Sequence, residues 1–373
     1  MGCAAFDRRI QAGPANFALR VRCGEPSWTE LADRIAEFRA DRFLLVADEA
    51  APTDHLSRVH ALAAAQAPCT VVTLPDGPDP PPAHDGRTVV IALGGQRACA
   101  VPADLRLPTT LAAACGPALA LLRPPVGSRT GPAATLPART DQARTAPALV
   151  WVRSDVLAAR PPAETRAGMV EVIRHVLAVC PAQYEALAKI LCPSARYTPQ
   201  ALAACVALCA DARSTLVCFD PFENGPALAL GYGRGLAGAV RSSADAAASA
   251  ALAPGDAEAL GLLLAARVAA HLGLLDGAAL WAHRELLARN GSATALPDGT
   301  DARALAVALT AAARPGLLLL DGLGWPHCSQ GRLLTRVDAA TLRAAAESLG
   351  RPGVPHSRGP AAEPVPASAG RPG

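Results

Sequence analysis

The stretch Cys218–Val240, which reads CFDPFENGPALALGYGRGLAGAV, constrains the fold more than any other part of this sequence. It contains an Asp-Pro turn, a Gly-Pro loop and a glycine-rich start of a helix. Because glycine has no Cβ, the backbone here can pass unusually close to another segment or to a ligand. From its residues alone, the stretch predicts either a tight helix packing site or a site of close ligand approach.

The first part of the chain alternates short apolar runs with helix candidates. Such runs are typical of buried parallel strands, and they occur at Arg42–Asp48, Cys69–Leu74, Thr88–Gly95 and Pro147–Val152. Helices are expected at Trp28–Arg39, with Ser27 as the N-cap, and at Thr53–Gln66. This β-α-β pattern predicts a Rossmann-like nucleotide-binding domain.

Beyond the last apolar run, the pattern becomes mainly helical, and a chain of 373 residues more often forms two domains than one. We therefore expect an α/β plus α architecture. Residues 1–152 would form a truncated Rossmann-like parallel-sheet domain, and residues 153–350 a mainly helical C-terminal domain. Residues 351–373 are rich in glycine and proline, and we expect a disordered tail there.

Composition excludes several classes of protein. The net charge of +3 comes from scattered residues without a basic cluster, so no nucleic-acid partner is expected. Eleven cysteines without a CxxC pair indicate reduced thiols in a cytoplasmic protein, with Cys205 and Cys209 as buried structural thiols. The N-terminus lacks an apolar signal region, and the apolar run Leu260–Leu275 is too short to cross a membrane.

The stretch at residues 218–240 closely resembles the metal-site segment of the sugar-phosphate cyclases, the family of dehydroquinate synthase. Within that family it looks most like the 2-deoxy-scyllo-inosose synthases of aminoglycoside antibiotic biosynthesis. The residues that carry the match are Asp220, Pro221, Glu223, Leu228, Leu230, Tyr232, Gly233, Ala239 and Val240. The resemblance runs from about Arg42 to Leu342 and implies a dehydroquinate synthase-like fold.

The resemblance also implies a zinc or cobalt ion held by one glutamate and two histidines, with open positions for substrate oxygens. Glu171, within Met169–Arg174, matches the metal-binding glutamate. Arg234 and Pro254 stand where the family has its two histidines. We therefore predict that Glu171 forms an ion pair with Arg234 in place of a metal site.

An NAD site is implied at the carboxyl end of the strand Thr88–Gly95. Gly94, Gly95, Thr109 and Thr110 match the family's cofactor-binding segments, although the family's third glycine is Gln96 here. A strand that ends in Gly-Gly lets backbone N–H groups approach a pyrophosphate. The alternative interpretation is an ordinary turn.

Four further residues are candidate catalytic or substrate-binding groups by resemblance. Arg174 and Arg213 stand at positions of substrate-binding lysines, and His283 matches a histidine that contacts substrate. Arginine offers a planar fork and does not reproduce a compact ammonium group. Glu223 is a candidate acid, and its alternative role is a solvated or capping turn residue. His283 is alternatively an ordinary helix histidine.

Two classes of function follow. In the first, the chain is an enzyme that uses NAD and a divalent metal to convert glucose 6-phosphate into a carbocyclic inosose with loss of phosphate, or that acts on another sugar phosphate. In the second, it is a non-catalytic homologue that serves as a partner or scaffold. Arg234 and Pro254 discriminate between the two classes. The resemblance further implies a cytoplasmic homodimer whose small-molecule ligand is a sugar phosphate.

Overall fold

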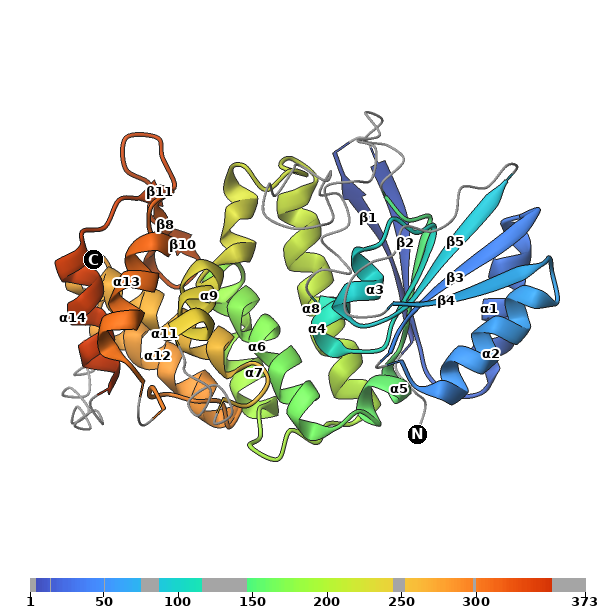
Figure 1. Ribbon diagram of the computed structural model, residues 1–373, viewed down its shortest axis with the longest axis horizontal. Coiled ribbons are helices and arrows are strands. Elements are labelled where there is room, and N and C mark those ends of the chain that lie inside the picture. Colours follow the sequence, from blue (N-terminus) through green and yellow to red (C-terminus); the bar gives the residue numbers. More distant parts are fainter. Residues whose placement is uncertain are drawn as a thin grey trace, which may run out of the picture.

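The computed structural model describes residues 5–13, 15–49, 51–74, 87–115, 146–243, 252–297 and 300–350. A sheet-containing N-terminal part is followed by a helical C-terminal part (Figure 1). The predicted tail at residues 351–373 lies outside the described residues.

The N-terminal part is built on a seven-stranded sheet with the order β1-β2-β7-β6-β5-β3-β4. Its strands are β1 (Phe6–Ala12), β2 (Ala15–Arg22), β3 (Arg42–Asp48), β4 (Cys69–Leu74), β5 (Thr88–Gly94), β6 (Leu105–Pro108) and β7 (Leu149–Arg153). Neighbouring strands are parallel, except that β1 runs antiparallel to β2. The predicted strands β3, β4, β5 and β7 are confirmed.

The hairpin of β1 and β2 is not among the strands that the sequence predicts. In β2 the side chains of Phe17, Leu19 and Val21 are buried, while the residues between them are more exposed. This alternation with a period of two is a strand signal that the sequence does contain. Since β2 pairs with β7, the hairpin extends the parallel sheet beyond the strand that was expected to complete it.

The direction in which the sheet grows reverses at β3. The chain passes from β3 to β4 on one side, and then to β5 on the other side of β3. In open α/β sheets, ligands bind outside the carboxyl ends of the strands at such a switch point. The carboxyl ends of β3 and β5 carry Asp48 and Gly94.

Helices cover both faces of the sheet, with α1 and α2 on one side and α3 and α4 on the other (Figure 1). Their bounds are α1 (Pro26–Glu37), α2 (Thr53–Ala64), α3 (Gln96–Ala100) and α4 (Leu111–Cys115). The expected N-cap at Ser27 is wrong, because α1 begins at Pro26 and the Ser27 hydroxyl donates to the Gly24 carbonyl at 2.7 Å. A proline at the first helical position lacks an N–H group that would otherwise be unsatisfied.

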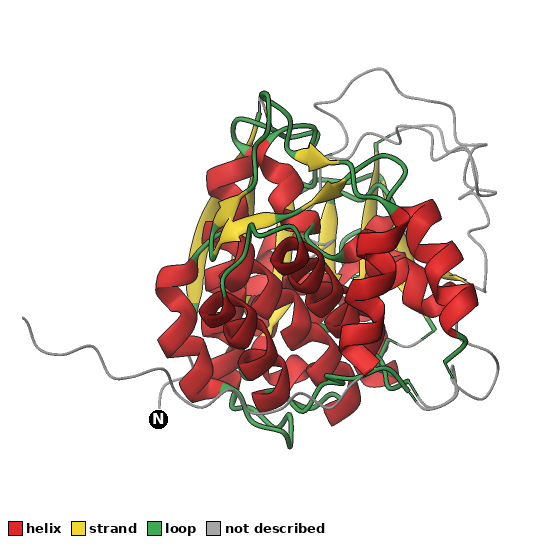
Figure 2. Cartoon of the chain, turned by 90° about the vertical axis from the view of Figure 1, so that its left-hand side faces the viewer, coloured by secondary structure: helices red, strands yellow, loops and turns green. Residues whose placement is uncertain are grey.

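The C-terminal part is built mainly of helices (Figure 2). These helices pack around a continuous apolar core. The helices are α5 (Ser154–Ala158), α6 (Pro162–Ala178), α7 (Tyr184–Ile190), α8 (Pro199–Val217), α9 (Arg234–Ser243), α11 (Asp256–His271), α12 (Gly277–Arg289), α13 (Ala302–Ala312) and α14 (Ala339–Gly350). Two 3-10 turns, η3 (Pro181–Gln183) and η4 (Pro226–Gly231), and short strands, β8 (Leu317–Leu318), β9 (Leu320–Gly322), β10 (Trp325–Pro326) and β11 (Leu334–Thr335), complete this part.

Helix α8 is, within the part of the chain that the structure describes, the one helix whose length and apolar composition would suffice to cross a membrane. Half of its apolar window is buried inside the protein, as in the core helix of a globular domain. Cys205 and Cys209 on α8 are free and buried, which confirms their prediction as buried thiols. The expectation that all cysteines are reduced does not hold for Cys23, which is disulfide-bonded.

Helices α9 and α11 cross at two glycines. A Cβ atom built on Gly261 of α11 would lie 2.6 Å from the backbone nitrogen of Ala237 and 2.6 Å from the carbonyl oxygen of Gly233. Gly233 has a φ of +76°, and a Cβ there would lie 2.9 Å from the backbone nitrogen of Leu262. The glycine-rich stretch is therefore a site of close helix packing, one of the two interpretations given for it.

We expect Gly261→Ala to destabilise the protein by about 2 kcal/mol or more, because backbone atoms that cannot move aside occupy the space that a methyl group needs. The matched control is Gly238→Ala in α9, where a Cβ meets nothing within 4 Å. Alanine there should stabilise the helix by roughly 0.5–1 kcal/mol. Denaturant unfolding followed by circular dichroism measures both changes, and equal effects of the two substitutions would contradict the close crossing.

Candidate functional site

Glu171 is the centre of a buried cluster of charges. Helix α6 places Glu171 and Arg174 three residues apart on one face, so that their side chains meet. Nη1 of Arg174 donates a hydrogen bond to Oε1 of Glu171. Nη2 of Arg234, the first residue of α9, donates to Oε2 of Glu171 at 3.1 Å. The predicted ion pair between Glu171 and Arg234 is thus present.

The cluster extends through Arg174 to a third helix. Nη2 of Arg174 donates to Oε2 of Glu258 on α11 at 2.8 Å, and Nε donates to the carbonyl oxygen of Tyr232 at 2.8 Å. On the other side of Glu258, Nη1 of Arg241 donates to Oε1 at 2.7 Å. The result is an alternating chain of positive and negative side chains that joins α6, α9 and α11.

Arg174 was a candidate substrate-binding residue, and the structure places it inside this chain of paired charges. Its side chain is fully buried, and each of its guanidinium nitrogens donates to a protein acceptor. A guanidinium in this state has no surface left for a substrate. Arg174 therefore positions the three helices.

The charges of this cluster support one another. Burial alone would raise the pKa of the Glu171 carboxyl, but the guanidinium groups of Arg174 and Arg234 hold it well below its usual range. Burial would lower the pKa of Arg234, yet Glu171 raises it above its ordinary value. Glu171 and Arg234 therefore stay ionised and paired.

The side chains at the expected metal site do not fit a divalent cation. Both carboxylate oxygens of Glu171 accept hydrogen bonds from guanidinium groups, and the side chain of Pro254 has no donor atom to offer a metal. In the described parts of the chain, no group of three or more His, Cys, Asp or Glu residues could hold a metal ion. A dication at Glu171 would instead meet the positive charge of Arg234.

Glu223 and Arg213 form a second buried pair. Nη2 of Arg213 on α8 donates to Oε1 of Glu223 at 2.9 Å, and both side chains are buried. The alternative of a solvated turn residue for Glu223 is therefore wrong, because a buried guanidinium requires a carboxylate partner at this point. The adjacent turn is held by Asp220, whose carboxylate accepts from the backbone nitrogens of Asn224, Gly225 and Ala227.

His283 on α12 lies fully buried against Tyr232. The carbonyl oxygen of Ala279, 2.7 Å from Nδ1, can only accept, so Nδ1 carries the proton. Nε2 then accepts from the Tyr232 hydroxyl at 3.1 Å. Burial lowers the pKa of His283 to about 4, which keeps the ring neutral. The Tyr232 carbonyl also accepts a hydrogen bond from Arg174. His283 therefore holds in place a residue that contacts the charged cluster.

The four candidate cofactor-binding residues come together at the switch point of the sheet. The backbone nitrogen of Thr109 donates to the Gly94 carbonyl at 2.8 Å. A Cβ on Gly95 would lie 3.4 Å from Oδ2 of Asp48 and 3.5 Å from Cγ2 of Thr110. The four residues are thus neighbours in the structure, and their role in cofactor binding stays a prediction.

Each of these residues also has a structural role that needs no cofactor. A Cβ on Gly94 would lie 2.5 Å from the Cβ of Asp48, so a glycine is required for packing against β3. The Thr110 hydroxyl accepts from the backbone nitrogen of Ala113 at 3.2 Å, and the Thr109 side chain is buried. Helix α3, which follows Gly95, has only five residues. Among the described residues, this edge is a turn whose contacts serve the packing of β3, β5 and α4.

Sequence reasoning missed Glu258 as a member of the cluster. The available signal was its place in the first turn of α11, four residues after Pro254, where an acidic side chain faces the start of a helix. Tyr232, one of the residues that carry the family resemblance, connects Arg174 with His283 through its carbonyl and hydroxyl groups.

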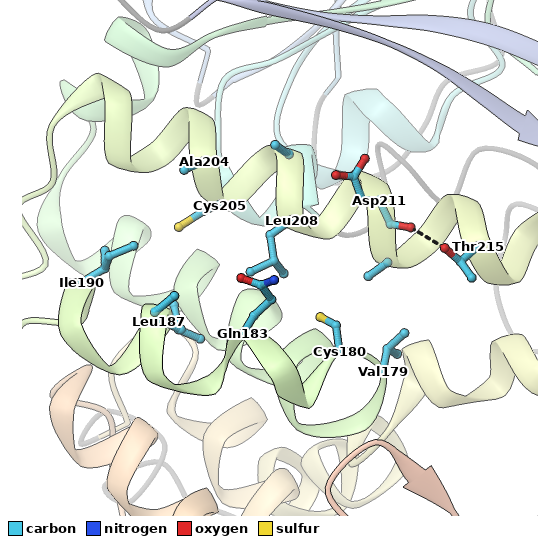
Figure 3. Close-up of a pocket in the computed structure, with 13 residues that line it drawn as sticks. Val179, Cys180, Gln183, Leu187, Ile190, Ala204, Cys205, Leu208, Asp211 and Thr215 are labelled. Atoms are coloured by element: carbon cyan, nitrogen blue, oxygen red, sulfur yellow. Dashed lines mark hydrogen bonds between the residues drawn. The ribbon is translucent and has the colours of Figure 1, made fainter.

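A separate groove lies between α8 and the segment formed by η3 and α7 (Figure 3). It encloses about 530 Å³ and is lined mainly by apolar side chains, among them Leu187, Ile190 and Leu208. Asp211 and Thr215 lie toward one end of it (Figure 3). None of the candidate site residues lines this groove.

The chain is similar in sequence to known synthases. A family model described as 3-dehydroquinate synthase C-terminal matches residues 168–311. The 2-deoxy-scyllo-inosose synthase of Streptomyces fradiae is 30% identical over 327 residues, which cover 79% of this chain and 71% of that protein. The enzyme of the same name from Streptomyces lividus is 32% identical over 217 residues, and this match spans only 56% of that protein's length.

Solved structures show the same fold. A crystal structure of 2-deoxy-scyllo-inosose synthase complexed with carbaglucose-6-phosphate, NAD+ and Co2+ superposes with a TM-score of 0.77 at 20% identity, covering 92% of this chain and 100% of that one. The 2-epi-5-epi-valiolone synthase of Streptomyces hygroscopicus subsp. jinggangensis 5008, with NAD+ and Zn2+ bound, gives a TM-score of 0.63 at 16% identity and covers 88% of this chain and 96% of that one. The predicted fold class is confirmed.

Removing the central arginine should be far more costly than removing the one at the end of the cluster. Arg174→Met leaves Glu171 and Glu258 in the interior without their shared partner, and we expect a loss of about 3–5 kcal/mol in the free energy of unfolding. Arg241→Met, at an exposed position, should cost about 1 kcal/mol or less. Urea denaturation measures both losses in the free energy of unfolding. Losses of similar size would contradict the central role of Arg174 in the cluster.

The pH dependence of stability should report His283. Its pKa of about 4 in the folded protein lies below the ordinary 6.5, so the unfolded chain binds a proton first as the pH falls. The stabilisation is present above pH 6.5 and is lost progressively toward pH 4, by roughly 3 kcal/mol. His283→Gln should reduce this pH dependence by that amount. Burial also lowers the pKa of His55 to about 4. Because the wild-type protein and the His283→Gln variant both keep His55, its contribution cancels when their pH profiles are compared.

Proposed function

Because the chain belongs to the sugar-phosphate cyclase family of 3-dehydroquinate synthase and 2-deoxy-scyllo-inosose synthase, we propose that it is a non-catalytic member of that family. It keeps the fold of these enzymes but does not carry out metal-assisted cyclisation of a sugar phosphate.

One observation carries this proposal: both oxygens of the Glu171 carboxylate accept hydrogen bonds from arginine side chains. In a catalytic metal site, carboxylate and imidazole ligands leave positions open at which the metal polarises substrate oxygens. Here the Arg234 guanidinium neutralises the carboxylate. A guanidinium does not release protons at physiological pH, and it has no open coordination position.

The groups that would hold a substrate support the same proposal. Arg174 and Arg213 stand at positions of substrate-binding lysines, yet both are buried and paired with carboxylates inside the protein. A phosphate group would have to displace Glu171 and Glu258 from Arg174, or Glu223 from Arg213. Such a displacement would leave buried carboxylates without partners, which is strongly unfavourable.

The residues at the switch point support NAD binding less well than the family resemblance implies. Gly95 could bring its backbone close to a pyrophosphate, and such a cofactor would supply hydride transfer. Gln96 replaces a third glycine, and the Thr109 side chain is buried. We therefore include no hydride transfer in the proposed function.

The alternative, a cyclase that retains reduced activity on glucose 6-phosphate or another sugar phosphate, is supported by the length of the alignment with the Streptomyces fradiae synthase. A role as a homodimeric partner or scaffold in the cytoplasm is consistent with the non-catalytic proposal. The nine free cysteines among the described residues support a reducing compartment, whereas the disulfide at Cys23 does not.

We expect the purified protein to form no inosose from glucose 6-phosphate in the presence of NAD and Co2+ or Zn2+, because the described residues offer no binding site for the dication. Product analysis by mass spectrometry should be performed beside the Streptomyces fradiae synthase as a positive control. Elemental analysis of the same preparation should find far less than one metal ion per chain. Product formation above the no-enzyme level, or stoichiometric zinc or cobalt, would overturn the proposal.

A further inference from the structure

Helix α8 is apolar on all sides, yet the protein covers only part of it. Its sequence, PQALAACVALCADARSTLV, contains two charged residues, and half of its apolar window is buried. Asp211 accepts a hydrogen bond from Nε of Arg8 at 2.9 Å, and Arg213 is paired with Glu223. A helix without a polar face is normally buried. Among the described residues, the exposed side of α8 therefore lacks the cover that its composition requires.

The groove between α8 and the segment of η3 and α7 runs along this exposed side (Figure 3). On α8, the lining residues recur every three or four positions, as on one face of a helix: Ala204, Leu208, Asp211 and Thr215. Those on α7 follow the same spacing: Ala186, Leu187 and Ile190. The groove encloses about 530 Å³, whereas an apolar cavity of about 150 Å³ already holds a benzene ring. It therefore has room for a large aromatic side chain.

Phe219 is an aromatic side chain at the end of the same helix. Helical hydrogen bonding continues past α8, because the backbone nitrogen of Asp220 donates to the Leu216 carbonyl at 3.0 Å. Phe219 therefore follows Thr215 by one turn, on the side of α8 that carries the groove. It is 88% exposed, the largest fraction among the large hydrophobic side chains of the described residues. An exposed aromatic ring beside an open apolar groove marks an interaction surface.

A second copy of this chain is the occupant that fits both features. Phe219 and Leu208 are eleven residues apart, roughly 16 Å along a helix, and Phe219 does not fill its own groove. A two-fold axis midway between them brings Phe219 of each copy to the groove of the other, so that the same contact forms twice. Charge does not oppose this contact, because Asp211 is paired with Arg8 in each copy. A flat bilayer would cover Phe219 but leave the concave groove unfilled.

We propose that this chain forms a two-fold symmetric dimer in which Phe219 of each copy inserts into the groove between α7 and α8 of the other. Aromatic side chains that fill an apolar pocket of a partner commonly dominate the binding free energy. The inference goes beyond the proposed function, because it identifies an interaction surface that shares no residue with the cluster around Glu171. It holds whether or not the chain is catalytic.

Sedimentation equilibrium of the full chain tests this inference, and the wild-type protein should be a dimer at micromolar concentration. Phe219→Ser should raise the dissociation constant by about 30-fold or more, because two identical anchors are lost from each dimer. The matched control is Trp325→Ser, which removes a 73% exposed aromatic side chain from β10 and should change the constant by about two-fold or less. Leu208→Asp places a charge in each groove and should dissociate the dimer as Phe219→Ser does.

Cross-linking identifies the contact itself. The variant Phe219→benzoylphenylalanine carries a photoreactive ring, and it is mixed with an isotope-labelled copy of the wild-type chain before irradiation. Cross-links should join the two kinds of chain and end in peptides that line the groove of the labelled copy. Cross-links confined to one chain, or ending outside the groove, would contradict the proposed contact.

A wild-type protein that stays monomeric up to about 100 µM would overturn the inference, as would a dimer that Phe219→Ser and Trp325→Ser weaken equally. A monomer that binds phosphatidylcholine vesicles through Phe219 would overturn it too, because the exposed side of α8 would then belong to a membrane surface. Binding of Co2+ or formation of inosose contradicts the non-catalytic function alone and leaves the predicted dimer contact unchanged.

Discussion

The ionic contact between Glu171 and its two arginines determines how the C-terminal part is arranged. Arg174 on α6 and Arg234 on α9 meet at one carboxylate, and Arg174 continues to Glu258 on α11. A metal ion would tie helices together by coordination. Here fixed charges do so by hydrogen bonds, which need no cofactor. Such a cluster is stable only if every member keeps its partner, because a single unpaired charge in the interior is strongly unfavourable. The groups that connect the helices are therefore the same groups that close the Glu171 carboxylate to a metal ion.

The close crossing of α9 and α11 makes this contact possible. Gly261 and Gly233 let the two backbones approach until a methyl group would collide with main-chain atoms. At this separation, Arg234 at the start of α9 reaches Glu171. Arg241, about two turns further along the same helix, reaches Glu258. Tyr232 precedes the crossing and binds Arg174 through its carbonyl and His283 through its hydroxyl. Backbone packing and charge pairing thus depend on the same few residues.

The sequence allowed the fold and part of the site to be predicted, and the failures have physical reasons. Strands β3, β5 and β7 contain continuous apolar runs and β4 is rich in β-branched residues, so their pattern is clear, whereas the charged residues of β1 concealed the first hairpin. The pair of Glu171 and Arg234 followed from opposite charges at positions that the family resemblance brought together. The burial of Glu223 could not be predicted, because it depends on Arg213, which reaches this turn residue from helix α8. Glu258 was missed for a similar reason: a carboxylate in the first turn of a helix is more often a solvated residue.

By the family resemblance, two changed residues, Arg234 and Pro254 in place of two histidines, are enough to close the corner around Glu171 to a dication. One carboxylate and two imidazoles together present donor atoms to a dication, whereas one carboxylate, one guanidinium and one proline do not. Because Arg234 stays ionised and Glu171 stays deprotonated, no accessible pH restores a vacant carboxylate. Arginine differs here from histidine, which could release a metal and bind it again as the pH changes. The corner therefore keeps its ion pair over the whole accessible pH range, and the Glu171 carboxylate stays closed to a metal ion.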